Sequence, residues 1–397
     1  MKKLPWGTRN KLSDEEFYNR NKELSTIKSI LKTTEDANAP EMLLTGIRGV
    51  GKTVFLNKVK DDLIKEGFLV ILCDFSTSNS FQRGKLLIDD LMKHYYDEIL
   101  RECSKSKVKT ITTRVNKWLK TKNIQIKDIV TVKDIPLPLL TAEDDLNHLV
   151  DFVLNLPQEI YQNNTDKIKG VIVLIDEFQV VRELDEDMNS FLWTFRGNIQ
   201  NQNNVGYVLT GSMSIDDQLI YDIVSSNGIF GGRMITQHLN PFDKITVKNY
   251  LEEKAPYLEF NEESFERFFK CTNGLPYYIN ILANQLPQNI LLTEDDIVET
   301  FDNNLYYMIK HLFIIWIKLS NKEKDIIIAL LDKALSRKEL ANEVNLQSGS
   351  LSKYLTKLTK LNLIDNSNGS YSIKEQILKR WLKTEYKNNK CYPYRYV

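Results

Sequence analysis

The chain has 397 residues, a length that suits two or three domains, and its 53 basic and 53 acidic side chains give a formal net charge of zero. With 42% hydrophobic residues, the composition argues against disordered, collagen-like and supercharged proteins. No apolar run approaches the ~20 residues of a membrane helix, the start turns polar at once, and the four cysteines stand apart. The sequence therefore predicts a cytoplasmic protein with no membrane partner, no disulfides and no structural zinc.

Net neutrality hides an uneven distribution of charge. Residues 101–133 hold 10 Lys or Arg against 2 Asp or Glu, and residues 317–397 hold 16 against 8, so each segment carries +8. The rest of the chain holds the remaining 27 basic and 43 acidic residues. Such basic segments are either contacts for a phosphate backbone or solvated surfaces, and both interpretations stay open here.

The first element with recognisable chemistry is a glycine-rich loop. Residues 46–53 read Gly-Ile-Arg-Gly-Val-Gly-Lys-Thr, which matches the spacing G-x-x-x-x-G-K-T. Residues 42–45 predict a short buried strand before it, and the run from Val54 predicts an amphipathic helix after it. Gly46, Gly49 and Gly51 let successive amides face a phosphate chain at the start of that helix. The sequence therefore predicts a nucleotide site at this loop.

Two side chains at the end of the loop have specific roles in this interpretation. Lys52 is expected to reach the β and γ phosphates, and Thr53 is expected to offer its hydroxyl to Mg²⁺. Residues 170–175, a continuous apolar run, predict a parallel strand buried on both faces. Asp176 at its carboxyl end is expected to hold the Mg²⁺ through water, and Glu177 is expected to polarise the water that attacks the γ phosphate. A solvated acidic turn is the alternative.

Two further candidates follow along the chain. The strand predicted at residues 205–210 should lie between the first two in an open parallel sheet, so Thr210 or Ser212 is a candidate sensor of the γ phosphate. A plain strand-terminal turn is the alternative. Arg233 precedes a short strand-like run and is a candidate to stabilise the transferred phosphoryl group, from its own subunit or from a neighbour. A surface arginine or an internal ion pair fits it equally well.

In combination, these motifs resemble P-loop ATPases of the AAA+ and STAND-like group, and most of all the archaeal-type ATPase family. The resemblance covers roughly residues 13–385. It includes Phe-Tyr-Asn-Arg-Asn-Lys-Glu-Leu at residues 17–24, with Arg20 and Glu23 matching the pattern F-x-x-R-x-x-E-L, and Gly-Leu-Pro at residues 274–276. It implies ATP as the nucleotide, ATPase activity, and contact of Pro276 with the adenine. No arginine directly follows Pro276, so a second sensing arginine in the lid is not supported.

The resemblance also implies the fold class. It is α/β, with a P-loop NTPase parallel sheet of the AAA+/ASCE type, then a helical lid, then a winged helix-turn-helix domain. We predict an ATPase domain at residues 1–240 with a basic insertion at about residues 101–150, a lid at residues 241–316 and a winged helix at residues 317–397. In the third helix of the last domain, Leu351, Leu355 and Leu358 should face the core. The side chains then left exposed are Ser350, Ser352, Lys353, Thr356 and Lys357.

The leading functional hypothesis is a hydrolase that acts as a molecular switch. Mg-ATP would reposition the winged helix, which would contact double-stranded DNA or a partner protein, and the protein is also a candidate nucleotide-dependent homo-oligomer. The alternative is a nucleotide-gated DNA-binding regulator or scaffold, of a defence or mobile-element type, in which hydrolysis is incidental. A translocating helicase and a small-molecule kinase are weaker, because no second motor lobe and no acceptor pocket are evident.

Overall fold

The computed structural model describes residues 4–5, 9–106, 129–132, 135–138, 143–211, 218–225, 228–361, 363–367 and 369–393. The chain forms two compact units. The sheet unit comprises Arg20–Arg48 and Lys52–Leu239, and the helical unit comprises Met1–Asn19, Gly49–Gly51 and Asn240–Val397.

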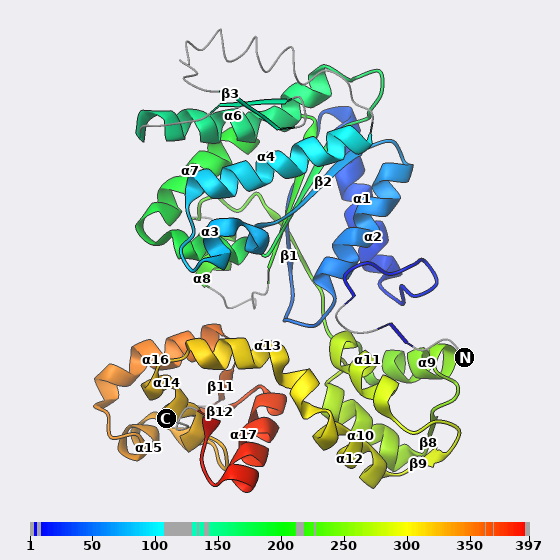
Figure 1. The fold of residues 1–397 in the computed structure, drawn as a ribbon, viewed down its shortest axis with the longest axis vertical. Helices are drawn as coiled ribbons and strands as arrows, with labels where there is room; N and C mark the ends of the chain where they lie inside the picture. The colour runs from blue at the N-terminus through cyan, green and yellow to red at the C-terminus, as the bar shows by residue number, and fades with distance from the viewer. Residues whose placement is uncertain are drawn as a thin grey trace. The chain divides into compact units, whose positions relative to one another are not determined.

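The sheet unit is built on five parallel strands in the order β2-β5-β6-β1-β7 (Figure 1). The strands are β1 (Glu41–Thr45), β2 (Leu69–Asp74), β5 (Val171–Asp176), β6 (Val205–Thr210) and β7 (Ile235–His238). All residues of β5 and β6 are buried, which explains their continuous apolar sequence. β6 lies between β5 and β1, as predicted, so the residues that follow these three strands leave the same edge of the sheet. The predicted P-loop sheet is thus confirmed.

Helices cover both faces of this sheet, with α1 and α2 on one side and α4, α6 and α7 on the other (Figure 1). The helices and 3-10 turns are α1 (Asn21–Lys32), η1 (Thr33–Asp36), α2 (Lys52–Lys65), η2 (Phe75–Thr77), α3 (Asn79–Gln82), α4 (Ile88–Lys105), α6 (Glu143–Gln162), η3 (Phe178–Asp187), α7 (Met188–Ile199) and α8 (Gln218–Val224). An antiparallel hairpin joins β3 (Ile129–Val132) to β4 (Ile135–Pro138). Residues 107–128, 133–134 and 139–142, which together make up more than half of the predicted basic insertion, lie outside the described residues.

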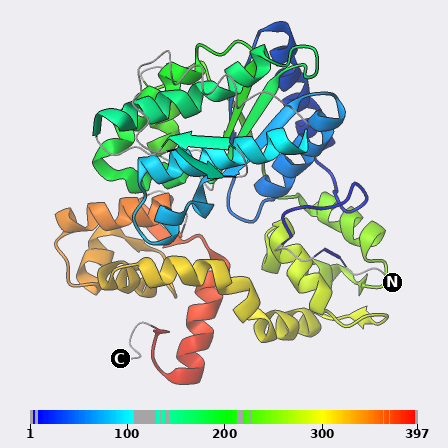
Figure 2. The ribbon, with the colours of Figure 1, turned by 45° about the horizontal axis from the view of Figure 1, so that its top comes forward.

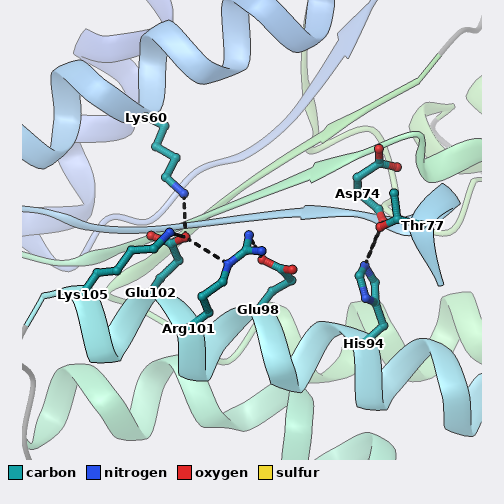
Figure 3. Close-up of polar contacts among 8 residues, drawn as sticks. All are labelled: Lys60, Asp74, Thr77, His94, Glu98, Arg101, Glu102 and Lys105. Atoms are coloured by element: carbon teal, nitrogen blue, oxygen red, sulfur yellow. Dashed lines mark hydrogen bonds and ion pairs between the residues drawn. The ribbon is translucent and has the colours of Figure 1, made fainter. Parts of the chain in front are cut away.

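An ion-pair network centred on the buried Glu102 joins α2 to α4 (Figure 3). Glu102 of α4 is only 3% exposed, and its Oε1 lies 3.0 Å from Lys60 Nζ of α2 and 2.8 Å from Lys105 Nζ. Burial alone would raise the pKa of Glu102, but the hydrogen bonds from Lys105 and Lys60 outweigh it and leave the pKa below its usual value. Burial in turn lowers the pKa of Lys60, although Glu102 opposes this. Each side chain of the pair therefore stabilises the charged form of the other.

The other end of α4 is fixed to the sheet. His94 Nε2 donates a hydrogen bond to the backbone oxygen of Asp74, the last residue of β2, over 2.9 Å, and Thr77 Oγ1 donates to the same oxygen over 2.7 Å (Figure 3). Asp74 pairs in register with Asp176 of β5. One helix thus contacts both the carboxyl edge of the sheet and the helix that follows the glycine-rich loop.

The helical unit contains two groups of helices, and α13 leads from one to the other, in yellow in Figure 2. The first group comprises α9 (Lys244–Lys254), β8 (Glu259–Phe260), α10 (Glu262–Thr272), α11 (Pro276–Gln285), β9 (Leu291–Leu292), α12 (Glu294–Asn303) and α13 (Leu305–Lys318). The second comprises α14 (Asn321–Ala329), β10 (Leu335–Ser336), α15 (Arg337–Glu343), α16 (Ser348–Lys360), β11 (Ile364–Ser367), β12 (Ser370–Ile373) and α17 (Gln376–Asn389). Its strands form an antiparallel sheet in the order β10-β12-β11, the element order expected for a winged helix-turn-helix.

Two features of the helical unit differ from the predicted domain limits. The N-terminal segment Met1–Asn19 groups with this unit, because Tyr18 packs on Tyr250 and Asn284 Nδ2 donates to Leu4 O over 3.0 Å. The predicted limit between residues 316 and 317 falls inside α13. Within the described part of the chain, no helix is long and apolar enough to cross a bilayer.

The third helix of the predicted winged helix, α16, has the expected amphipathic pattern. Leu351, Leu355 and Leu358 are buried. The five residues predicted to be exposed, Ser350, Ser352, Lys353, Thr356 and Lys357, are exposed, and so are Ser348 and Gly349 at the start of the helix. At least two of the five already have a partner: Lys357 Nζ lies 2.9 Å from Glu323 Oε1, and Ser352 Oγ accepts a hydrogen bond from Arg337.

Candidate nucleotide site

The glycine-rich loop connects β1 to α2 in a conformation that requires glycine. Gly49 and Gly51 have φ angles of 85° and 96°, in the left-handed region that other residues rarely adopt. Gly49 belongs with the helical unit, where its carbonyl oxygen accepts a hydrogen bond from Tyr277 N over 3.3 Å. Tyr277 directly follows Pro276, which is the first residue of α11. The tip of the loop therefore contacts the first turn of α11.

Lys52, the first residue of α2, turns back on its own loop. Its Nζ donates hydrogen bonds to Gly46 O over 2.7 Å and to Ile47 O over 3.2 Å. Burial lowers the pKa of Lys52 to about 8, although Glu177 and Asp176 act in the opposite direction. Among the described residues, the hydrogen-bond partners of this buried ammonium group are backbone carbonyls, and it is well suited to exchange them for phosphate oxygens.

Thr53 and Asp176 meet at the carboxyl edge of the sheet. Thr53 Oγ1 donates to Asp176 Oδ2 over 2.6 Å, and the amide of Glu177 donates to Asp176 Oδ1 over 2.9 Å. Burial raises the pKa of Asp176 to about 6; the bond from Thr53 lowers it, whereas the neighbouring carboxylates of Glu177 and Asp74 raise it further. The ionised form of Asp176 thus costs free energy at this buried position, and a cation beside it would offset that cost.

The oxygens of Thr53 and Asp176 fit the magnesium ion that the sequence predicts. Mg²⁺ prefers oxygen ligands and binds through one or two protein oxygens together with phosphates and water. A hydroxyl and a buried carboxylate, brought together from two distant segments, provide such a pair. Thr53 and Asp176 are therefore the residues that would hold the ion.

Glu177 has an unusual backbone. Its φ and ψ are 52° and 37°, the left-handed conformation, and it precedes η3. Gln179 Nε2 donates a hydrogen bond to Glu177 Oε2, and between them Phe178 is fully buried against Phe75 and Phe195. Strained non-glycine residues tend to occur at functional sites, and here the strained residue is the predicted general base.

The remaining candidates are not all brought to this edge. Thr210 ends β6, and its side chain is buried, whereas Ser212 lies outside the described residues. Arg233 precedes β7, where Ile235 pairs with Met42, so it lies at the amino edge and its charge acts on Glu41. With β1 five residues long, about 15 Å of strand separate it from the loop. The structure does not bring Arg233 to the phosphate loop of its own chain.

One residue at the site went unrecognised in the sequence. His238 ends β7, and its Nδ1 shares a hydrogen bond of 2.8 Å with Oγ1 of Thr45, the last residue before the loop. Burial lowers the pKa of His238, with further contributions from Lys52 and Arg20. Its position after a parallel strand was the available signal, since ligand sites form at the carboxyl ends of such strands.

Comparison with known proteins identifies the family. The family described as an ATPase domain predominantly from Archaea matches residues 17–282, more than half of the chain. The chain belongs to this family. A search of curated proteins found no match for this chain.

Solved structures agree with this assignment at the level of the fold. The Walker-type ATPase PABY2304 of Pyrococcus abyssi is similar with a TM-score of 0.64 and 20% identity, over 95% of this chain and 99% of that one. The ORC2 protein of Aeropyrum pernix, solved as ADPNP and ADP complexes, is similar with a TM-score of 0.52 and 14% identity, over 94% and 96% of the two chains. This ATPase-domain protein therefore has an AAA+-type fold.

Proposed function

We propose that the protein is a molecular switch that binds and hydrolyses Mg-ATP and uses the occupancy of the site to reposition its C-terminal winged-helix module. The observation that carries this proposal is the 2.6 Å hydrogen bond between Thr53 Oγ1 and Asp176 Oδ2. It joins the glycine-rich loop to the acidic end of β5 across 123 residues of sequence. The ATPase-domain family supports ATP as the nucleotide.

In this proposal, different residues bind the phosphates, hold the metal ion and accept the proton. The amides from Gly46 to Thr53 receive the phosphates, and Lys52 exchanges its bonds to Gly46 and Ile47 for bonds to the β and γ phosphates. Thr53 and Asp176 hold Mg²⁺, which when bound neutralises charge on the phosphate oxygens. Glu177 accepts the proton of the attacking water.

Three further residues complete the proposed pocket. Val54, in the first turn of α2, adds a backbone amide near the phosphates. Pro276 contacts the adenine, which the hydrogen bond from its neighbour Tyr277 to Gly49 O supports. Thr210 or Ser212 senses the γ phosphate, and the position of β6 between β5 and β1 supports this.

Arg233 is proposed to act in trans. Because it lies at the amino edge of its sheet, the phosphoryl group that it stabilises would belong to a second copy of the chain in a nucleotide-dependent homo-oligomer. The mass in solution, measured with and without a slowly hydrolysed ATP analogue, tests this assembly. A monomer under both conditions would count against it.

Replacing Lys52 by Ala tests the binding step. Loss of a charged hydrogen-bond donor to the phosphates should weaken ATP affinity about 10- to 100-fold, as measured by calorimetry with Mg-ATP. Lys58→Ala on the same helix is the matched control, because Lys58 pairs with Asp62 over 2.7 Å and lies beyond the loop. Equal ATP affinity in the wild type and Lys52→Ala would contradict the assignment.

A nucleotide-gated DNA-binding regulator is the second candidate, and the exposed Ser350, Ser352 and Lys353 of α16 favour it. If α16 contacts phosphates, Lys353→Ala in the full chain should weaken binding to duplex DNA and reduce the slope of log affinity against log salt by about 1. Lys387→Ala, an exposed lysine of α17, is the control. DNA affinity that is unchanged by Lys353→Ala and independent of salt would exclude this use of α16.

A further inference from the structure

Gln179 is a polar side chain that the structure adds to the predicted general base. Its Nε2 donates to Glu177 Oε2, so one oxygen of the carboxylate already has a partner. The reverse orientation of the amide would bring two oxygens together, so electrostatics determines which atom faces Glu177. The sequence suggested no role for this residue.

The backbone between the two residues keeps this contact in place. Phe178 is fully buried between Phe75 and Phe195, and Val180 N donates to Glu177 O over 3.0 Å. The side chains of Glu177 and Gln179 are therefore held on a turn that cannot rotate without disturbing the core. Gln179 Oε1 is buried and has no hydrogen-bond partner among the described residues, so the bond to Glu177 is the contact that orients the amide.

We propose that Gln179 is a positioning residue for ATP hydrolysis, which holds Glu177 Oε2 so that Oε1 faces the attacking water. This inference rests on the proposed function. In the step itself, the water oxygen bonds to the γ phosphorus, the bond from phosphorus to the bridging oxygen breaks, and ADP leaves with that electron pair. Glu177 Oε1 takes the water proton while Oε2 keeps its bond to Gln179.

The test compares two substitutions of Gln179 in the full chain. Gln179→Leu removes the donor, and Gln179→Glu keeps the size and shape but also cannot donate in its ionised form. Both should lower kcat about 10-fold or more, with the KM and the calorimetric affinity for Mg-ATP within about twofold of the wild type. If packing alone mattered, the isosteric Gln179→Glu variant would keep the wild-type kcat.

Gln158→Leu is the matched control. Gln158 is also partly buried with one hydrogen bond, since its Oε1 accepts from Asn204 N over 3.2 Å at the amino edge of the sheet. This variant should keep the wild-type kcat.

The outcomes separate the inference from the proposed function. If the wild type turns over ATP and Glu177→Gln does not, but both Gln179 variants match the wild type, the inference is overturned and the proposed function stands. A rise in kcat for Gln179→Leu would also overturn it, because Gln179 would then restrain the base. A wild type without turnover would overturn both.

Discussion

Replacing Glu177 by Gln is expected to lower kcat for ATP hydrolysis about 100-fold or more, while Mg-ATP still binds. Gln has the size of Glu but cannot accept the proton of the attacking water. The bonds that Asp176 receives from Thr53 Oγ1 and from the amide of residue 177 do not involve the Glu177 side chain. Steady-state turnover and calorimetry with Mg-ATP on the same preparation measure both effects.

Glu183→Gln is the control for this prediction, because Glu183 is an exposed acid on the same 3-10 segment. It should hydrolyse ATP at the wild-type rate. A kcat for Glu177→Gln within a few-fold of the wild type would show that Glu177 is not the general base.

Replacing Glu102 by Ala is expected to lower the free energy of unfolding by about 3–5 kcal/mol. The change leaves Lys60, whose side chain is 13% exposed, without its carboxylate partner. Urea unfolding of the full chain measures the loss, and hydrogen exchange at the amides of α4 locates it. Because the pKa of Glu102 is held below its ordinary value of 4.5, its contribution is complete above that pH and disappears as the pH falls through the lowered value.

Two control variants separate the buried pair from ion pairs in general. Asp89→Ala removes the partner of Lys93 on the same helix, and both of these side chains are 49% exposed. This variant should lower the free energy of unfolding by less than about 1 kcal/mol. The double variant Glu102→Met with Lys60→Met should cost less than Glu102→Ala, because it removes both charges and keeps the volume. A loss for Glu102→Ala no larger than that for Asp89→Ala would contradict the prediction.

Local sequence was enough to predict the parts of the site that lie next to one another in the chain. The loop from Gly46 to Thr53 and the acids at the end of β5 are recognisable because strand, turn and helix signals surround them. The position of Arg233 also followed from its sequence context: a residue before a parallel strand lies at the amino edge, away from the phosphate loop.

The contacts between distant segments could not be predicted in the same way. The pairing of His238 with Thr45 depends on the register of β7 against β1, and that of Lys60 with Glu102 on the packing of α2 against α4. A single sequence does not indicate how segments so far apart in the chain are aligned against each other. The hydrogen bonds of Lys52 to Gly46 and Ile47 could not be predicted for another reason, since the motif indicates contacts of the lysine with phosphates and says nothing of its contacts with the chain.

With Glu177 as the proposed general base, its left-handed backbone makes stability and activity conflict at this position. Glycine or asparagine would adopt φ 52° at lower conformational cost, so a sequence chosen only for folding would place one of them there. Neither could take up a proton from water. Variants at this position that make the protein more resistant to heat should therefore be poor enzymes, and thermal screening alone would favour inactive proteins.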